Sequence, residues 1–311
     1  MSGEKSKSSG EIGEKLAAKL LDMLGWGKAL SNISIDCNTR THLGEGGKQK
    51  KSHGEDRVFL YNNPFHDDRT DVVHISVKNT SDKYPGKVGV VTELKAHLTE
   101  LNEIIDCAKN SPELNQIIHS SKVRRHIFHS GVLIWLHNDL TEIEKDIKPA
   151  LSHVRLDPNH TTPIYLIDNA RATFLLKIIE DLRSKEQNSK FSFYYPRIGT
   201  AVSVDEERSG ALLPLELLAA DIVPAKLSVN GATELVIYAN QTFSEDAYRK
   251  LIAYGLNFAN GLVNTIRIGM PGYNPARDIQ TADRASLAFP NRSEKTSPFS
   301  IDKTLLSLLE Q

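Results

Sequence analysis

Two neighbouring segments rich in β-branched and aromatic residues constrain the fold of this chain most strongly. RVFLY (57–61) and VVHISVK (72–78) are typical of strands, and the segment between them, NNPFHDDRTD, is dense in turn-forming residues. We therefore expect an antiparallel hairpin whose turn is centred near His66. Paired positions in such a hairpin have a constant sum, so residue 56 should lie opposite residue 76.

The alternation of side chains along a strand makes this hairpin a candidate site. His74, Ser76 and Lys78 should share one face of the second strand, because successive side chains point to opposite faces. Asp56, just before the first strand, should then lie beside Ser76 and near Lys78. A shift of register by one residue would undo this arrangement. The hairpin therefore predicts an acid and a lysine together at one end of a sheet.

A helix is expected before the hairpin, over residues 11–24 (EIGEKLAAKLLDML). Its apolar residues fall on one broad face: Ile12, Leu16, Ala17, Leu20, Leu21 and Leu24. At about 100° per residue, Glu14 falls beside Leu21, at the edge of this face. A carboxylate there is costly unless it is paired or binds a cation. Glu14 is therefore the acid of this helix that we expect to turn toward a site.

Further elements follow the same kind of pattern. NISIDC (32–37) alternates as a strand does, a long helix is expected from about residue 88 to 109, and a short helix should begin at Pro112. The polar, basic segment SSKVRRH (120–126) is interpreted as a joint. After it, strand and helix patterns alternate, which predicts a second α/β domain. The expected organisation is a disordered tail at 1–10, a first α/β domain at 11–120, a linker at 121–130 and a second α/β domain at 131–311.

Composition limits the classes of function and compartment. With 311 residues, two domains are the natural expectation. A formal net charge of −1 gives no general attraction for nucleic acid, so such a contact needs a local patch. The two cysteines, Cys37 and Cys107, fit a reducing cytoplasm. No apolar run approaches the roughly 18 residues of a membrane span, and the N-terminus has no signal-peptide pattern. We expect a cytoplasmic protein without a membrane partner.

The order helix, strand, hairpin, helix resembles the PD-(D/E)xK nuclease family. The matching residues are Gly13-Glu14, the segment HGED (53–56) before RVFLY, and Ser76-Val77-Lys78 in HISVKNT, and the resemblance covers about residues 11–110. It implies a restriction-endonuclease-like α/β core and a Mg²⁺-dependent phosphodiesterase in which Mn²⁺ can substitute. It implies a catalytic set of Glu14, Asp56, Ser76 and Lys78, with Glu14 and Asp56 as metal ligands and Lys78 serving the attacking water.

One position departs from the family pattern. Ser76 stands where the family usually has an acid, and serine is a much weaker Mg²⁺ ligand than a carboxylate. This leaves Glu14 and Asp56 as the matched carboxylates, with the Val77 carbonyl as a candidate to aid them. Asp71 and Glu93 are candidates to supply the missing charge. The departure also leaves a second interpretation open, a catalytically inactive subunit that binds nucleic acid or a partner protein.

A closer resemblance concerns longer segments. GEKLAAKLLDMLGW, IDC, HGEDRVFLY and HISVKNTSDKYP are together similar to the nuclease subunit of the GAPS type of two-component bacterial antiphage systems. This implies a dedicated second subunit encoded nearby, a hetero-oligomer that can include a homodimer, and a nucleic-acid substrate. DNA is favoured because most of the resembling nucleases cut it, and RNA, including tRNA, is the alternative. The second half of the chain would be the regulatory or partner-binding module.

Several other residues are candidates for nucleic-acid contact: Lys48, Lys50, Lys51, His53, Tyr84, Arg124 and Arg125. Each also has an ordinary interpretation. The lysines suit a solvated loop, His53 a surface position, Tyr84 packing, and the two arginines an exposed linker.

Cys37, His42 and His53 are candidate zinc ligands by residue type. No CxxC or HxxxH pair accompanies them, so the sequence pattern does not favour a zinc site.

Overall fold

The computed structural model describes residues 2–152, 154–156, 160–185, 189–196, 208–229, 232–259 and 263–302, with the backbone alone for residues 2–10, 45, 189 and 229. The chain divides into two compact units, Met1–Thr173 and Phe174–Gln311. Both contain a mixed sheet and helices, which confirms an α/β fold followed by a second α/β unit. Within the described residues, no helix combines the length and apolar character that a bilayer crossing requires.

The first unit is built on a sheet in the order β1-β2-β3-β4-β5. Strand β2 is antiparallel to both of its neighbours, β1 and β3, whereas β3, β4 and β5 run parallel to one another. The strands are β1 Leu30–Asp36, β2 Ser52–Asn62, β3 Arg69–Thr80, β4 His126–His137 and β5 Ile164–Ile167.

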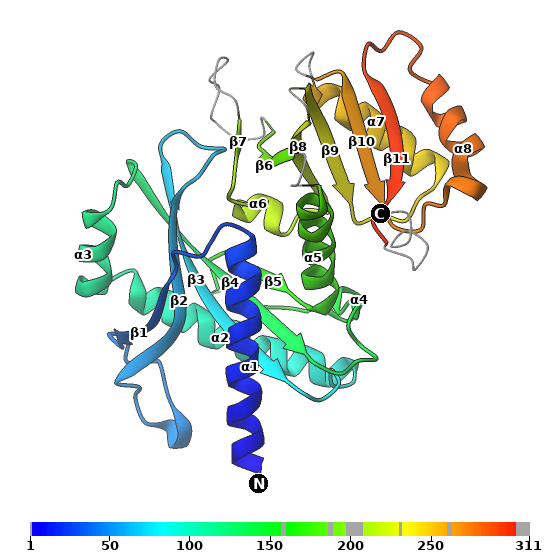
Figure 1. Ribbon diagram of the computed structural model, residues 1–311. Helices are drawn as coiled ribbons and strands as arrows, with labels where there is room; N and C mark the ends of the chain where they lie inside the picture. The colour runs from blue at the N-terminus through cyan, green and yellow to red at the C-terminus, as the bar shows by residue number, and fades with distance from the viewer. Residues whose placement is uncertain are drawn as a thin grey trace. The chain divides into compact units, whose positions relative to one another are not determined.

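Helices cover both faces of this sheet (Figure 1), with α1 in front of it and α2 behind it. Behind the sheet, Leu101 and Ile105 of α2 pack with Leu133 and Trp135 of β4. The helices are α1 Ser2–Met23, α2 Lys87–Ala108, α3 Pro112–Ser120, α4 Lys148–Leu151 and the first residues of α5 Asn169–Ser184. This burial on both faces holds the hairpin in the middle of the unit.

The hairpin register agrees with the sequence expectation. The pairs run from Asn62↔Thr70 to Arg57↔Ile75, so paired positions sum to 132 and residue 56 stands at the level of residue 76. Regular pairing ends at Arg57, and the two strands separate beyond it. Asp56 therefore lies at the point where β2 and β3 diverge.

Helix α1 differs from the expectation at its start and in its buried face. Its backbone is helical from Ser2, so residues 2–10 are part of a helix and the predicted disordered tail at 1–10 was wrong for them. Ile12 and Leu16 are 48% and 43% exposed, whereas Gly13 is buried. A Cβ at Gly13 would lie 2.2 Å from the Cβ of Asn79. The helix approaches β3 through its smallest residue, and this rotates the two larger apolar residues outward.

The predicted boundary at residues 121–130 was also wrong. β4 begins at His126 and pairs with all twelve residues of β3, from Arg69↔His126 to Thr80↔His137. The backbone amide of Arg124 donates to the hydroxyl of Thr70. The segment looks like a linker in the sequence because residues 120–126 are largely polar, and the first four residues of β4 are exposed or only partly buried. The boundary lies instead between Thr173 and Phe174, inside α5.

The second unit contains a sheet in the order β11-β10-β9-β8-β6-β7. β9, β10 and β11 are parallel and are connected through α7 and α8, whose apolar residues form one core with β9 and β10. The elements are β6 Ser189–Tyr194, β7 Ser209–Gly210, α6 Leu215–Leu218, β8 Ile222–Val229, β9 Ala232–Ala239, α7 Glu245–Ala259, β10 Thr265–Met270, α8 Pro275–Leu287 and β11 Lys295–Ser300.

Candidate active site

Asp56 links the two strands of the hairpin at the point where they separate. Its Oδ2 accepts a hydrogen bond of 2.7 Å from the backbone amide of Val77. Opposite Asp56 in β1 stands Asn32, whose positive φ of 54° marks a local distortion of the strand pair. The Asp56 carboxylate therefore accepts the hydrogen bond that a backbone carbonyl of β2 would accept in a regular strand pair. Its second oxygen is not used by this bond.

Lys78 follows Val77 and meets a carboxylate from helix α2. Its Nζ lies 2.8 Å from Oε2 of Glu100, and the two side chains are 28% and 46% exposed. An ion pair this exposed is weak, because water and salt screen it. The lysine therefore remains available to another anion. Ser76, on the same face of β3, is buried.

A second carboxylate, that of Glu55, is buried next to Asp56. Its Oε1 accepts from Nδ1 of His74, whose Nε2 lies 2.9 Å from Nδ1 of His129. Its Oε2 is buried and has no hydrogen-bond partner among the described residues. Since a carboxylate only accepts, His74 donates to Glu55 from Nδ1. Burial, with smaller contributions from His74 and Lys109, lowers the pKa of His129 to about 3.

Glu14 does not contact the other candidate site residues, so its role as a metal ligand stays a prediction. Glu14 is exposed on α1, and no hydrogen bond or ion pair among the described residues joins it to Asp56 or Lys78. Its neighbour Gly13 contacts Asn79, the residue after Lys78. The structure therefore brings α1 to the end of β3 that carries Lys78, but it does not bring the Glu14 carboxylate into contact with Asp56 or Lys78.

Neither acid proposed to replace the one missing at Ser76 lies at the pair. Asp71 is fully buried and bonds Asn63 and Arg69 near the hairpin turn. Glu93 is exposed on α2, two turns before Glu100. The sequence analysis missed Glu100, which contacts Lys78, and Glu55, which lies on the face of His74 and Ser76. Only Glu55 had a sequence signal, its place beside Asp56 in HGED.

Comparison with protein families gives the first unit an identity. A protein-family model described as the GAPS4 protein PD-(D/E)XK nuclease domain matches residues 1–171 of the sequence. The chain belongs to this family. The match includes β4 and β5 and ends two residues before the boundary at Thr173, so the GAPS4 nuclease domain and the first unit coincide closely. A comparison with curated proteins found none that matches.

The basic loop of the GAPS4 nuclease domain lies between β1 and β2. Lys50 pairs with Glu103 of α2 at 2.7 Å, whereas Lys48 and Lys51 are exposed. His53 is 4% exposed and lies against His42, so the expectation of a surface histidine was wrong. Of these four residues, Lys48 and Lys51 keep a free cationic surface for phosphate.

Tyr84 belongs to the core of the GAPS4 nuclease domain. Its side chain is 7% exposed, and its hydroxyl donates to the backbone oxygen of Trp135 at 2.7 Å. Its ring also packs against that of His137, with centroids 3.9 Å apart. Burial raises the pKa of Tyr84. Stacking on a base is excluded because both the ring and the hydroxyl are already engaged.

Arg124 stabilises the hairpin turn. Its guanidinium donates to the backbone oxygens of Asn63, at 2.6 Å, and His66. This turn lies nine residues along β3 from Lys78, which corresponds to about 30 Å at the rise of a strand. Arg125 is exposed beside it. The two arginines therefore do not belong to the site around Asp56 and Lys78.

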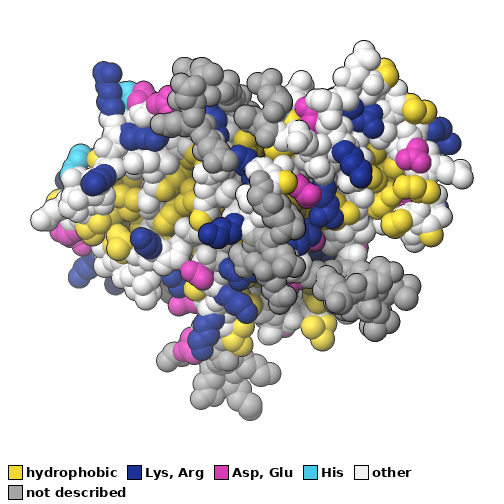
Figure 2. All heavy atoms as spheres, turned by 45° about the horizontal axis from the view of Figure 1, so that its top comes forward, with side chains coloured by type: hydrophobic (Ala, Val, Ile, Leu, Met, Phe, Trp, Pro, Cys, Tyr) yellow, Lys and Arg dark blue, Asp and Glu magenta, His cyan; other side chains and the backbone are white. Residues whose placement is uncertain are grey.

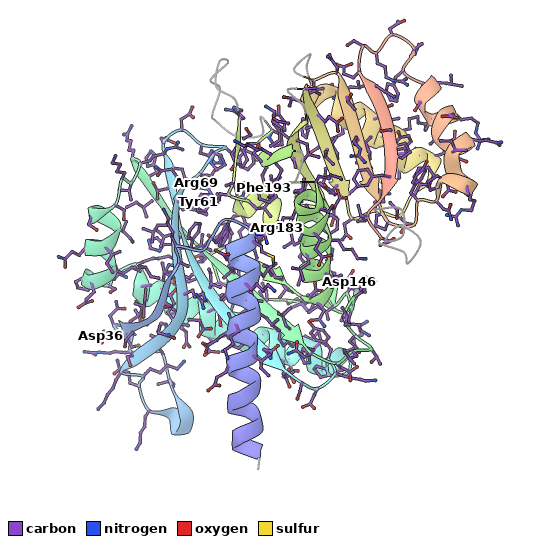
Figure 3. The ribbon with its side chains drawn as sticks, in the orientation of Figure 1. Asp36, Tyr61, Arg69, Asp146, Arg183 and Phe193 are labelled. Atoms are coloured by element: carbon purple, nitrogen blue, oxygen red, sulfur yellow. The ribbon has the colours of Figure 1, made fainter. Side chains whose placement is uncertain are left out.

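The two ends of the hairpin can be followed in Figure 3. Asp36, the last residue of β1, is labelled at one end of the sheet, and Tyr61 and Arg69 are labelled toward the turn. On the face shown in Figure 2, lysine and arginine side chains lie in small separate groups rather than one continuous surface. The domain has an acid–lysine site at one end of its sheet, without a broad cationic surface on that face.

Proposed function

We propose that this chain is a Mg²⁺-dependent nuclease that hydrolyses phosphodiester bonds in DNA, and that it is the effector subunit of a cytoplasmic bacterial antiphage defence complex. The observation that carries the proposal is the bond from Asp56 to the Val77 amide beside Lys78. This bond supports the proposal because it joins Asp56 to the residue before Lys78 within a GAPS4 PD-(D/E)XK domain. Nothing in this pair reads a base or a sugar hydroxyl, so RNA, including tRNA, is the alternative substrate.

The side chains around Lys78 fit a hard divalent cation. Asp56 has a carboxylate oxygen outside its bond to Val77, and Glu100 brings a second carboxylate to Lys78. Mg²⁺ and Mn²⁺ prefer such oxygen ligands. Asp56 and Glu14 would bind the metal, and Glu100 would supply the charge that Ser76 lacks. When bound, Mg²⁺ supplies a more acidic water and neutralises charge that develops on the phosphate.

Lys78 would act on the attacking water or on the phosphate. Its ammonium lies 2.8 Å from a carboxylate that is nearly half exposed. A phosphate group entering the site competes for the same ammonium, because exposed ion pairs contribute little free energy. Lys78 would then donate to the reacting oxygen atoms and stabilise the charge of the pentavalent state.

A partner subunit would complete the grip on nucleic acid. The chain has a net charge of −1, and its visible cationic groups are dispersed. Binding of a polyanion gains affinity from many simultaneous phosphate contacts, which such a surface does not provide alone. The second unit, residues 174–311, would bind that partner, and a homodimer of this chain can form part of the same complex.

The second candidate function is a non-catalytic subunit that binds nucleic acid or a partner protein. The observation that favours it is Ser76 at the position of the usual acid, where its side chain is buried. Such a protein would keep the fold and bind without cleaving.

One experiment separates the two candidates. The full chain, with and without the product of the neighbouring gene, is incubated with DNA or RNA in Mg²⁺ or EDTA, alongside Asp56→Asn and Lys78→Met. We expect Mg²⁺-dependent cleavage of DNA that both substitutions abolish. Cleavage that survives both substitutions would contradict the proposed site. Binding without cleavage in every condition would establish the second candidate.

A further inference from the structure

Four side chains that are far apart in the sequence converge at one point of the first unit. Cys37 follows β1, His42 lies in the loop after it, His53 belongs to β2 and Cys107 to the last turn of α2. Their ligand atoms, two thiol sulfurs and two imidazole nitrogens, all lie within 4.8 Å of one another. A cluster of four such groups is the donor set of a Cys₂His₂ metal site.

Four of the six distances within the cluster are close to the edges of a tetrahedron around zinc, and all six are within 4.8 Å. With Zn–S of about 2.3 Å and Zn–N of about 2.05 Å, the edges are about 3.8 Å for S–S, 3.5 Å for S–N and 3.3 Å for N–N. The two sulfurs lie 4.0 Å apart, and Nδ1 of His42 lies 3.7 Å and 3.4 Å from them. The two imidazole nitrogens lie 3.4 Å apart. Each of these edges is within about 0.3 Å of the zinc geometry.

Burial and charge favour the same ligand. Cys107, His53 and His42 are 0%, 4% and 7% exposed, and apolar residues of β1, β2 and α3 surround Cys107. Two thiolates and two neutral imidazoles neutralise the charge of one Zn²⁺, which a buried site requires. We propose that Cys37, His42, His53 and Cys107 bind one structural Zn²⁺. On binding, each thiol releases its proton to solvent.

The loop that carries His42 is folded to present it. The His42 amide donates to the oxygen of Thr39, and the Lys50 amide donates to the oxygen of His42. Leu43 and Gln49 form a bridge between the two sides of the loop, and the Cys37 amide donates to the oxygen of Lys51. These backbone bonds hold the imidazole of His42 between the two sulfurs.

Neither a disulfide nor a magnesium site would account for the whole cluster. A disulfide would use only Cys37 and Cys107, whose sulfurs lie 4.0 Å apart and would have to move to bonding distance. It would not account for the two imidazoles that converge on the same point. Mg²⁺ prefers oxygen ligands, and this cluster offers sulfur and nitrogen. The zinc site is therefore chemically distinct from the metal site proposed at Asp56.

The zinc would join the strand and the helix that carry the candidate active site. His53 lies three residues before Asp56 in β2, and Cys107 lies seven residues after Glu100 in α2. The Lys50–Glu103 ion pair is a second link between the loop and the helix. Binding of Zn²⁺ fixes the separation of β2 and α2, and so the separation of their carboxylates. The zinc proposal does not depend on nuclease activity.

The test is a measurement of metal content in the full chain. The protein is purified under reducing conditions, supplied with Zn²⁺ and freed of loosely bound metal. Its zinc content is then measured by inductively coupled plasma mass spectrometry. We expect about one zinc per chain, as one closed four-ligand site requires. Cys107→Ser and His53→Asn should lose this zinc, while His119→Asn, an exposed histidine on α3, should keep it.

A second measurement does not require the variants to fold. Wild-type protein loaded with Co²⁺ in place of zinc should show the intense visible bands of tetrahedral cobalt and the near-ultraviolet thiolate-to-cobalt band. Wild-type protein without zinc and without these bands would overturn the proposal. So would a Cys37–Cys107 disulfide in metal-free protein, or an unchanged zinc content in folded Cys107→Ser and His53→Asn.

Discussion

The carboxylate of Asp56 accepts a hydrogen bond from the backbone amide of Val77, the residue before Lys78. The bond lies where β2 and β3 stop pairing, so the acid holds the end of β3 with one oxygen and keeps the other outside this bond. Asp56 therefore has a structural role and a proposed chemical role, and substitutions can separate them.

Asp56→Asn should remove activity while keeping the fold, because an amide oxygen can still accept from Val77 but brings no charge to a metal. We expect activity to fall by on the order of 100-fold or more, with the free energy of unfolding changed by less than about 1 kcal/mol. Asp56→Ala should lose activity equally and cost about 1–2 kcal/mol of stability, because the Val77 amide loses its acceptor. Cleavage assays and urea unfolding measure the two effects. Equal stability of the two variants would contradict the structural role.

Glu100→Gln should lower nuclease activity and raise the Mg²⁺ concentration required for half-maximal cleavage. The reason is that Glu100 brings the only α2 carboxylate in contact with Lys78 among the described residues. Glu93→Gln is the matched control, since Glu93 lies on the same helix two turns away and is exposed. We expect a decrease of on the order of 10-fold for Glu100→Gln and no change for Glu93→Gln. A decrease in both variants would indicate a general charge effect.

Gly13→Ala should push helix α1 away from β3. The added Cβ would lie 2.2 Å from the Cβ of Asn79, which neither backbone can accommodate without a shift. We expect a loss of stability of about 1–3 kcal/mol, measured by urea unfolding. Gly86→Ala is the control, because no heavy atom lies within 4 Å of the position of its Cβ. If Glu14 acts at the site, Gly13→Ala should also lower activity, because the shift of the helix moves Glu14 with it.

His129 should make the protein sensitive to acid. Its pKa is lowered to about 3 in the folded chain, so the unfolded chain binds the extra proton between about pH 6.5 and pH 3. The free energy of unfolding should therefore fall as the pH decreases through this range, by up to about 1.4 kcal/mol per pH unit. Between pH 7 and pH 5, wild type should lose about 2 kcal/mol more than His129→Asn does.

The comparison is made by urea unfolding at both pH values. His119→Asn serves as the control, because His119 is exposed and should leave the pH dependence of wild type unchanged. Identical pH dependence in wild type and His129→Asn would show that His129 is not kept neutral by burial.

The hairpin could be predicted from sequence because its register needs only a turn centre and a constant sum. The partner of Lys78 could not. Glu93 and Glu100 are seven residues apart, nearly two turns, so they lie on almost the same side of α2. Only the placement of the helix along the sheet, a difference of about 10 Å, decides which one meets Lys78.

Other differences have equally local causes. The convergence of Cys107 with His53 depends on the same placement of α2. The two residues are 54 positions apart, so no short sequence motif such as CxxC links them. The start of β4 resembles a linker because the residues that lead into it are largely polar, and its first four residues are exposed or only partly buried. Strand β8 contains Pro224 and strand β11 contains Pro298, and proline argues against a strand when only the sequence is known.

The pairing of β3 with β4 determines the smallest piece of this chain that can fold. A fragment ending at residue 120 would keep every residue of the PD-(D/E)xK pattern, yet it would expose the whole edge of the strand that carries Lys78. Open edges of this length recruit strands from other molecules, so such a fragment should aggregate when expressed. A fragment ending near residue 173 closes that edge with β4 and β5 and should remain monodisperse.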